Sequence, residues 1–222
     1  MRKFRIALPF LALLALSAAS DAQITEKKGG YLIQIKYRKG QVIRQNISMI
    51  AAGNSKLATN TQIITKCLDV DKNGIATLEV TTPTQPGKPP SVRKTKVDRF
   101  GRPMGNTIDG FSSNFMWPDR PLKVGESWKG DLNMAKTGQG NGMMKAKYKF
   151  VGIRSDKGTK IAVIAAYMDV TGQYDVAGTG TINIRVADGQ IHSATFNMGM
   201  SQYNEGGKPT VLKLVMTIRT ML

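Results

Sequence analysis

The sequence predicts a mainly β protein, with an antiparallel sheet that forms a half-barrel, a barrel or a sandwich and at most one or two short helices. Two observations lead to this prediction. Apolar and polar residues alternate with a period of two in many segments, which is typical of antiparallel strands with one solvated face. Turn signals that contain glycine separate these segments at the spacing of β-hairpins. Helix signals, by contrast, are scarce.

The first half of the chain begins with a predicted strand over residues 31–38, YLIQIKYR, which places Tyr31, Ile33, Ile35 and Tyr37 on one face. Further along, DVDKNGIA contains Asn-Gly at residues 73–74, a strong signal for a two-residue hairpin turn. The Pro-rich segment 81–91 lies between two strand-like runs and predicts an extended, exposed loop.

The second half holds three more segments with clear alternation. Residues 145–150, 181–186 and 211–218 each place apolar side chains on one face and polar ones on the other. The segment 160–170, KIAVIAAYMDV, is apolar on both faces and predicts a central strand that is covered on both sides. Turns at Gly158 and Gly189 fit hairpins between these strands.

The middle of the chain departs from the strand pattern. Asp109 can cap a short helix in which Phe111 and Phe115 fall at i and i+4, and Pro118 would end that helix. Residues 23–222 are predicted to form a single β-rich domain. Two loosely similar halves, residues 30–108 and 126–222, would be joined by residues 109–125; the similarity indicates either an internal duplication or shared hairpin chemistry.

The N-terminus has the three features of a signal peptide over residues 1–22. Basic residues precede a short apolar run, and Ser20 and Ala22 place small residues at the positions that a signal peptidase reads. We expect cleavage after Ala22 and a protein that is exported, either to the periplasm or into the medium; the alternative is a membrane anchor or a buried N-terminal helix. After processing, no transmembrane segment is expected.

Residues for catalysis are poorly represented. His192 is the only histidine, so neither a two-histidine metal site nor a serine–histidine triad with a nucleophile elbow is indicated. Cys67 is the only cysteine, which excludes an internal disulfide, and its strand-like surroundings predict a buried apolar role. We therefore expect no enzymatic activity, no cofactor and no metal site.

The formal net charge of +17 points to anionic partners. Because export makes nucleic acid a less natural partner, we expect none and favour anionic envelope lipids or polymers. A generally cationic, solvated surface is the alternative. The candidate anion-binding residues are Arg93, Lys94, Lys145, Lys147 and Lys149.

Flexible and aromatic apolar side chains suggest a second kind of partner, an apolar ligand or lipid held in a cavity of the sheet. The same side chains would serve equally well as a packed core, and the two tryptophans in particular are expected to pack at the joint between the halves. The candidate ligand-binding residues are Phe111, Phe115, Trp117, Trp128, Met198 and Met200.

A short motif carries a resemblance to a known group of proteins. The segment PLKVGESW, residues 121–128, follows the turn DRFG at residues 98–101. Together they resemble an exported, β-rich bacterial family of unknown function with a P-x-K-V-G-[DE]-[ST]-W motif. The layout is also distantly similar to the half-barrels of periplasmic lipoprotein carriers, which is a likeness of fold alone. The resemblance implies an exported β protein and assigns no catalytic residue.

Taken together, the sequence predicts a non-enzymatic exported protein that serves as an envelope binding or structural domain. Two alternatives stay open: a carrier of an apolar ligand or lipid in a β-sheet cavity, and a cationic module that docks on anionic envelope polymers or lipids.

Overall fold

A computed structural model describes residues 23–51, 54–84, 88–104, 116–130, 132–133, 143–171, 175–202 and 210–221. Across these ranges the protein is all β, and none of their residues is helical. The strands are β1 (Ile24–Lys27), β2 (Gly30–Ile33), β3 (Val42–Ala51), β4 (Asn54–Val70), β5 (Ala76–Thr82), β6 (Ser91–Val97), β7 (Ser127–Lys129), β8 (Leu132–Asn133), β9 (Met143–Asp156), β10 (Thr159–Thr171), β11 (Asp175–Arg185), β12 (Ile191–Gln202) and β13 (Thr210–Met221).

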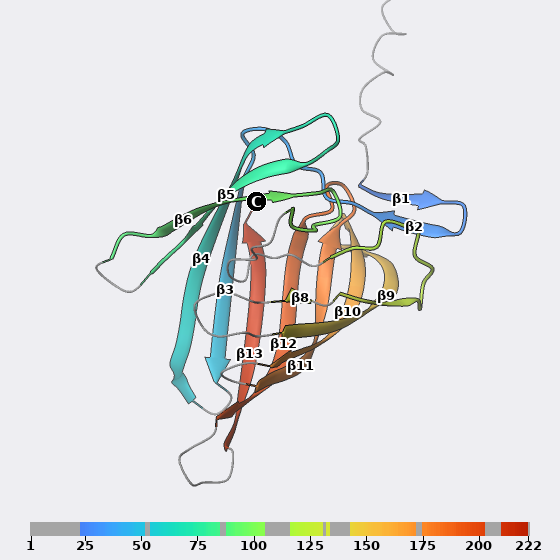
Figure 1. Ribbon diagram of the computed structural model, residues 1–222. Coiled ribbons are helices and arrows are strands. Elements are labelled where there is room, and N and C mark those ends of the chain that lie inside the picture. Colours follow the sequence, from blue (N-terminus) through green and yellow to red (C-terminus); the bar gives the residue numbers. More distant parts are fainter. Residues whose placement is uncertain are drawn as a thin grey trace, which may run out of the picture.

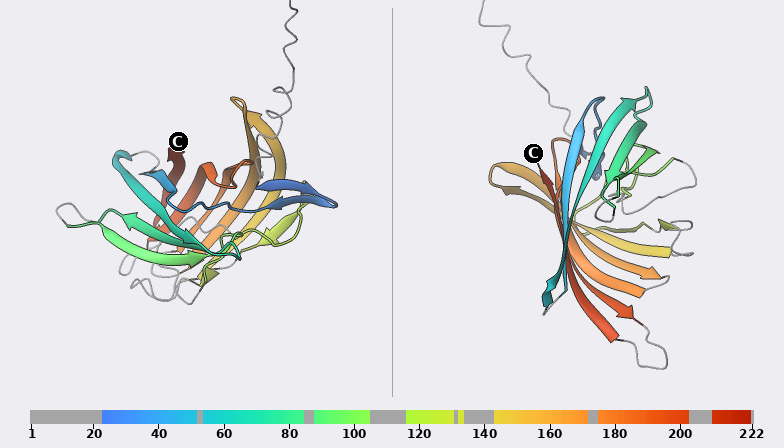
Figure 2. Two further views of the ribbon diagram at one scale, coloured as in Figure 1. Left: turned by 90° about the horizontal axis from the view of Figure 1, so that it is seen from above. Right: turned by 90° about the vertical axis from the view of Figure 1, so that its left-hand side faces the viewer.

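Eleven of these strands form one antiparallel sheet in the order β6-β5-β4-β3-β13-β12-β11-β10-β9-β7, with β8 also paired to β9. The sheet curves strongly but does not close on itself, so the predicted fold class is confirmed and the half-barrel is the form it takes (Figure 1). A separate two-stranded hairpin, β1–β2, lies over one end of the concave side (Figure 2).

Hairpin turns are present where the sequence predicted them. The turn at Gly74 is longer than the two-residue turn expected, since the Asp71 N–H donates to the Ile75 carbonyl at 3.0 Å across residues 72–74. Gly74 adopts φ 79°, and the Asp71 carboxylate accepts hydrogen bonds from the N–H groups of Asn73 at 2.8 Å and Ile75 at 2.9 Å. Between β9 and β10, Lys157 and Gly158 have φ values of 46° and 82°, which suit a tight two-residue turn. The described parts of segment 81–91 that lie outside β5 and β6 form an exposed loop, also as predicted.

The alternation of side chains builds the core on the concave face. In the central strands the buried apolar residues stand in directly opposite positions, such as Phe150 with Ile164 and Ile164 with Ile182. The outer face of β10 is more open than predicted, because Tyr167 is 46% exposed. The expectation that β10 is covered on both sides is therefore wrong along much of its length.

The strand predicted over residues 31–38 is also wrong in its second half, since β2 ends at Ile33. Beyond this point the backbone N–H groups bind three different segments: Gln34 donates to the Gln23 carbonyl at 2.9 Å, Ile35 to Arg99 at 2.7 Å and Lys36 to Asp188 at 2.9 Å. Ile35 and Tyr37 still pack against the hydrophobic clusters, but tertiary hydrogen bonds replace the ladder of a strand.

Candidate functional site

The upper part of the concave face is filled by segments from outside the large sheet. Tyr31 of β2 and Leu122 pair through two backbone hydrogen bonds of 2.8 and 2.9 Å, which tie the β1–β2 hairpin to the segment that precedes β7. Ile33 and Leu122 are fully buried in the same cluster as Phe150. This end of the half-barrel is therefore a packed core.

Both tryptophans belong to that core. Trp117 is 2% exposed and Trp128 is 8% exposed, and their rings meet edge to face at 6.2 Å between centroids. Trp128 also stacks on Tyr148 at 5.4 Å and donates its Nε1–H to the Met116 carbonyl at 3.1 Å. The packing interpretation of the two indoles fits this arrangement, so the candidate site does not include them.

The PLKVGESW motif forms the turn that joins this core to β9. The Glu126 carboxylate accepts the Lys123 N–H at 2.9 Å and pairs with Arg120. These two contacts, the backbone one first, lower the pKa of Glu126. Gly125, at φ 87°, donates to the Phe150 carbonyl at 2.7 Å. The motif thus has a structural role, and Glu126 is held as a paired carboxylate.

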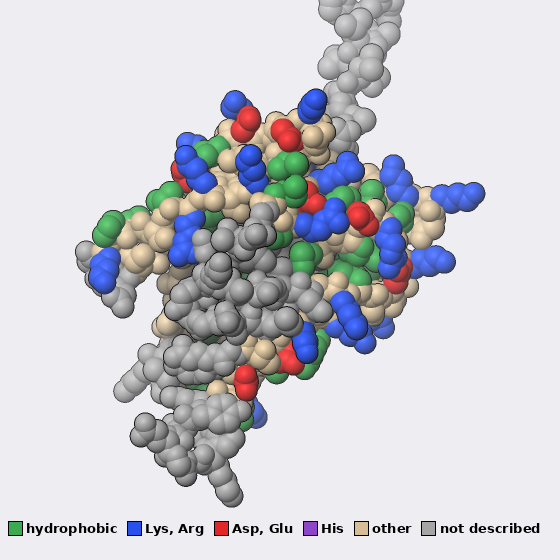
Figure 3. Space-filling model, in the orientation of Figure 1, with side chains coloured by type: hydrophobic (Ala, Val, Ile, Leu, Met, Phe, Trp, Pro, Cys, Tyr) green, Lys and Arg blue, Asp and Glu red, His purple; other side chains and the backbone are tan. Residues whose placement is uncertain are grey.

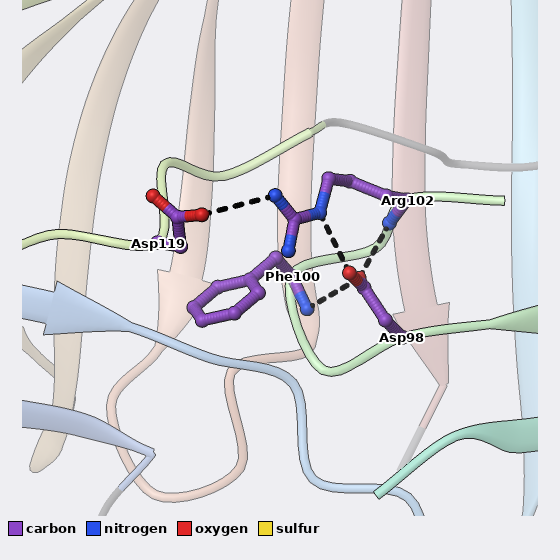
Figure 4. A network of polar contacts seen from close by, with 4 residues as sticks. All are labelled: Asp98, Phe100, Arg102 and Asp119. Atoms are coloured by element: carbon purple, nitrogen blue, oxygen red, sulfur yellow. Dashed lines mark hydrogen bonds and ion pairs between the residues drawn. The ribbon is translucent and has the colours of Figure 1, made fainter. Parts of the chain in front are cut away.

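The DRFG turn is fixed by a network of charged side chains (Figure 4). Asp98 accepts the N–H groups of Phe100 at 2.8 Å and Arg102 at 2.9 Å, and its second oxygen accepts Arg102 Nε at 2.6 Å. Arg102 also reaches Asp119 at 3.2 Å, and its guanidinium lies 4.8 Å from the centre of the Phe100 ring. The network connects the end of β6 to the segment that carries Trp117.

Beyond the packed end, the same concave face stays apolar but is only half-buried. We call this surface the apolar floor. It crosses three neighbouring strands in register, with Val176 opposite Met200 and Met198 opposite Leu214. All its side chains are intermediate in exposure. Phe196, which lies two residues before Met198 on β12, is fully buried. The floor consists of Val176, Met198, Met200, Leu212 and Leu214.

Two glycines of β11 shape the approach to this floor. Gly180 lies opposite Phe196 and Gly178 lies opposite Met198. A Cβ atom at Gly180 would overlap the Phe196 ring, and one at Gly178 would come within 2.8 Å of Met198 Cγ. The side chains of Phe196 and Met198 therefore occupy the space above these glycines. As a result, they extend less far into the concave side of the sheet.

The structure brings together only part of the predicted ligand-binding set. Met198 and Met200 lie in the apolar floor, Trp117 and Trp128 lie in the core, and Phe111 and Phe115 lie outside the described residues. The sequence had placed Leu212 and Leu214 on one face of a strand without assigning them to a site, and Val176 was missed. The register across β11, β12 and β13 is what joins them.

The predicted anion-binding residues fall into two groups. Lys145, Lys147 and Lys149 are exposed on the outer face of β9, whereas Arg93 and Lys94 are exposed on β6, at the far end of the strand order. Figure 3 shows Lys and Arg side chains around the visible face, with hydrophobic side chains between them.

Metal-binding side chains do not converge in the described part of the chain. It contains no cluster of three or more His, Cys, Asp or Glu side chains that could hold a metal ion. Cys67 is 1% exposed, and its burial raises the pKa of the thiol. His192 is the extra residue of a bulge in the β11–β12 pairing and is half-buried.

No protein-family model matches the chain, and neither does any curated protein. Among the described residues, no helix is long and apolar enough to cross a membrane.

Proposed function

We propose that the protein is a non-catalytic, exported binding protein that holds an apolar ligand, such as the acyl chain of a lipid, against the apolar floor. The observation that supports this most directly is the change in burial along one face. The same concave surface is fully buried where β1–β2 and residues 116–128 cover it, and half-buried at the floor. Contiguous apolar surface that stays partly accessible to solvent commonly marks a binding site on a soluble protein.

The composition of the floor suits a flexible apolar ligand. Met198 and Met200 have three rotatable bonds each and a polarisable sulfur, so they can adapt to chains of different shape. Leu212 and Leu214 supply more rigid apolar area beside them. Small-molecule sites are concave and mostly apolar in the same way. Export is part of the proposal and is supported by the signal-peptide pattern in residues 1–22.

A matched pair of variants on β12 tests the proposal. Met198→Lys introduces a charge into the floor, whereas Asn197→Lys introduces the same charge at the adjacent, exposed position on the outer face. We expect titration with a fluorescent fatty acid to show binding by the wild type and by Asn197→Lys. Met198→Lys should bind more than about 10-fold more weakly, because a buried charge is costly unless it is paired.

Native mass spectrometry of protein purified from lipid-containing extract should detect a bound lipid. Circular dichroism of both variants checks that they are folded, and Met198→Gln offers a milder change if the lysine variant does not fold. If the wild type binds neither the fatty acid nor a co-purifying lipid, the proposal is wrong and the concave face is simply a protein core.

A further inference from the structure

The outer face near the β7 edge of the sheet carries a row of lysines. Lys147 stands directly opposite Lys129 of β7, and Lys145 and Lys149 flank it on β9. Their strand neighbours Ala146, Tyr148 and Phe150 are buried, so alternation places all the lysines on the opposite, outer face. We call this surface the basic outer face: Lys129, Lys145, Lys147 and Lys149.

The four charges are close together. In the described part of the chain they form no ion pair, although Asp169 of β10 stands directly opposite Lys145. Residues two apart on a strand are separated by roughly 7 Å, and directly opposite residues by about 5 Å, so the row lies within about two Debye lengths at physiological salt. None of the four ammonium groups is within 4.0 Å of a carboxylate in the part of the chain that the structure describes. Because like charges in opposite positions destabilise a sheet, the fold bears a cost in keeping Lys129 and Lys147 together.

Exposed apolar and aromatic side chains border the lysines. Tyr167, 46% exposed, is directly opposite Lys147 on β10, and Val151, 48% exposed, follows two residues after Lys149. Val124 is 61% exposed and lies close to Gly152, since a Cβ there would be 3.9 Å from its side chain. Lysine stems and tyrosine rings suit the boundary between lipid headgroups and acyl chains.

We propose that the basic outer face docks the protein on a membrane surface that contains anionic lipid headgroups. Lysines near such a surface each contribute attraction that salt screens, while Tyr167, Val151 and Val124 can enter the headgroup layer. This combination favours a lipid surface over a soluble polyanion, which would use the charges but not the exposed apolar side chains. The inference is separate from the proposed ligand site, because the two surfaces lie on opposite faces of the sheet.

The other end of the sheet provides a matched control. Arg93, Lys94 and Lys96 of β6 are also exposed, but alternation divides them between the two faces of the strand, and Lys94 stands opposite Glu79. The triple variants K145Q/K147Q/K149Q and R93Q/K94Q/K96Q remove the same amount of charge. Only the first removes it from the basic outer face.

Co-sedimentation of the protein with vesicles tests the proposal. Vesicles of phosphatidylcholine mixed with phosphatidylglycerol should bind the wild type, and rising salt should weaken the binding; vesicles of phosphatidylcholine alone should bind little. K145Q/K147Q/K149Q should bind the anionic vesicles on the order of 100-fold more weakly, whereas R93Q/K94Q/K96Q should lose much less. Tyr167→Ser should weaken vesicle binding while leaving binding to soluble polyphosphate unchanged.

Equal losses in the two triple variants would mean that only net charge matters and would overturn the proposal. Binding to polyphosphate that is stronger than binding to vesicles, with no effect of Tyr167→Ser, would replace the membrane with a soluble polyanion. Circular dichroism should be the same for all variants, and the fatty-acid affinity of the apolar floor should not change, so failure here is distinguishable from failure of the proposed ligand site.

Discussion

Single glycines decide how the largest side chains of the concave face lie. Gly180 of β11 has no side chain to contact, and the Phe196 ring of β12 occupies the space that a Cβ would take. The ring is fully buried in that position. Glycine normally weakens a strand, so its presence in the middle of β11 is best explained by this close contact.

Gly180→Ala should therefore destabilise the protein by about 1–3 kcal/mol, because the added methyl group forces Phe196 or the neighbouring backbone to move. Urea denaturation measures the change. Gly199→Ala is the control. A Cβ there would meet one methyl group, Val211 Cγ1, at 3.3 Å, and the Ala177 carbonyl oxygen at 4.0 Å, so the variant should be close to neutral. Similar losses in both variants would contradict the role given to Gly180.

Sequence alone indicates some of these residue positions and not others. The alternation at residues 145–150 correctly separates the buried Tyr148 and Phe150 from the exposed lysines. The pairing of Gly180 with Phe196 depends on the register between two strands, which a bulge near His192 shifts by one residue. Local pattern contains no information about that shift.

At the scale of elements, the turn at residues 98–102 holds two parts of the molecule together. Asp98 is bound by two backbone N–H groups and by Arg102, and Arg102 continues to Asp119. The backbone N–H of Trp117 donates to the Phe100 carbonyl at 2.9 Å. The turn thus positions the segment that seals the packed end of the half-barrel.

Asp98→Asn should lower the free energy of unfolding by about 1–3 kcal/mol, because it removes a charged acceptor that is mostly shielded from solvent. Asp119→Asn removes the same charge at a side chain that is 64% exposed and should cost less than about 1 kcal/mol. Thermal or urea unfolding distinguishes the two. A larger loss for Asp119→Asn would show that the exposed ion pair, not the turn, is the important contact.

Elements with strong local signals were predicted well, and elements set by tertiary contacts were not. The turns at Gly74 and Gly158 follow from residues that tolerate positive φ. The end of β2 at Ile33 could not be foreseen, because the hydrogen bonds that replace the strand come from Gln23, Arg99 and Asp188. These partners are distant in sequence from one another.

At the scale of the whole molecule, the buried side chains of the described ranges form one large and one small hydrophobic cluster. The larger lines the concave side from β9 to β13, while the smaller, around Cys67, Leu78 and Val97, supports β4 to β6.

Because local stability follows buried apolar contact, we expect backbone amides of β5 to exchange with deuterium well before those of β11 and β12. Hydrogen exchange followed by mass spectrometry measures this, and equal protection of the two regions would contradict it.

The curvature of the sheet and its strand order could not be predicted from sequence patterns. Period-two alternation identifies which side chains share a face, but not which of the two faces becomes concave. The order also contains one step between strands that are far apart in the chain, from β3 to β13. The sequence predicted the class of fold, whereas long-range pairing determines the position of the apolar floor.

That pairing of β3 with β13 also affects the order in which the protein can mature. Of the described strands, β13 is synthesised last, and it fills the gap between β3 and β12. Until β13 has been synthesised, β3 and β12 each have an unpaired edge. The β3–β6 part of the sheet therefore cannot pair with the part that runs from β12 to β7. A chain that is synthesised from its N-terminus therefore cannot complete this sheet until β13 has emerged from the ribosome. A ribosome that stalls before residue 210 would leave the edges of β3 and β12 unpaired, and unpaired strand edges promote aggregation.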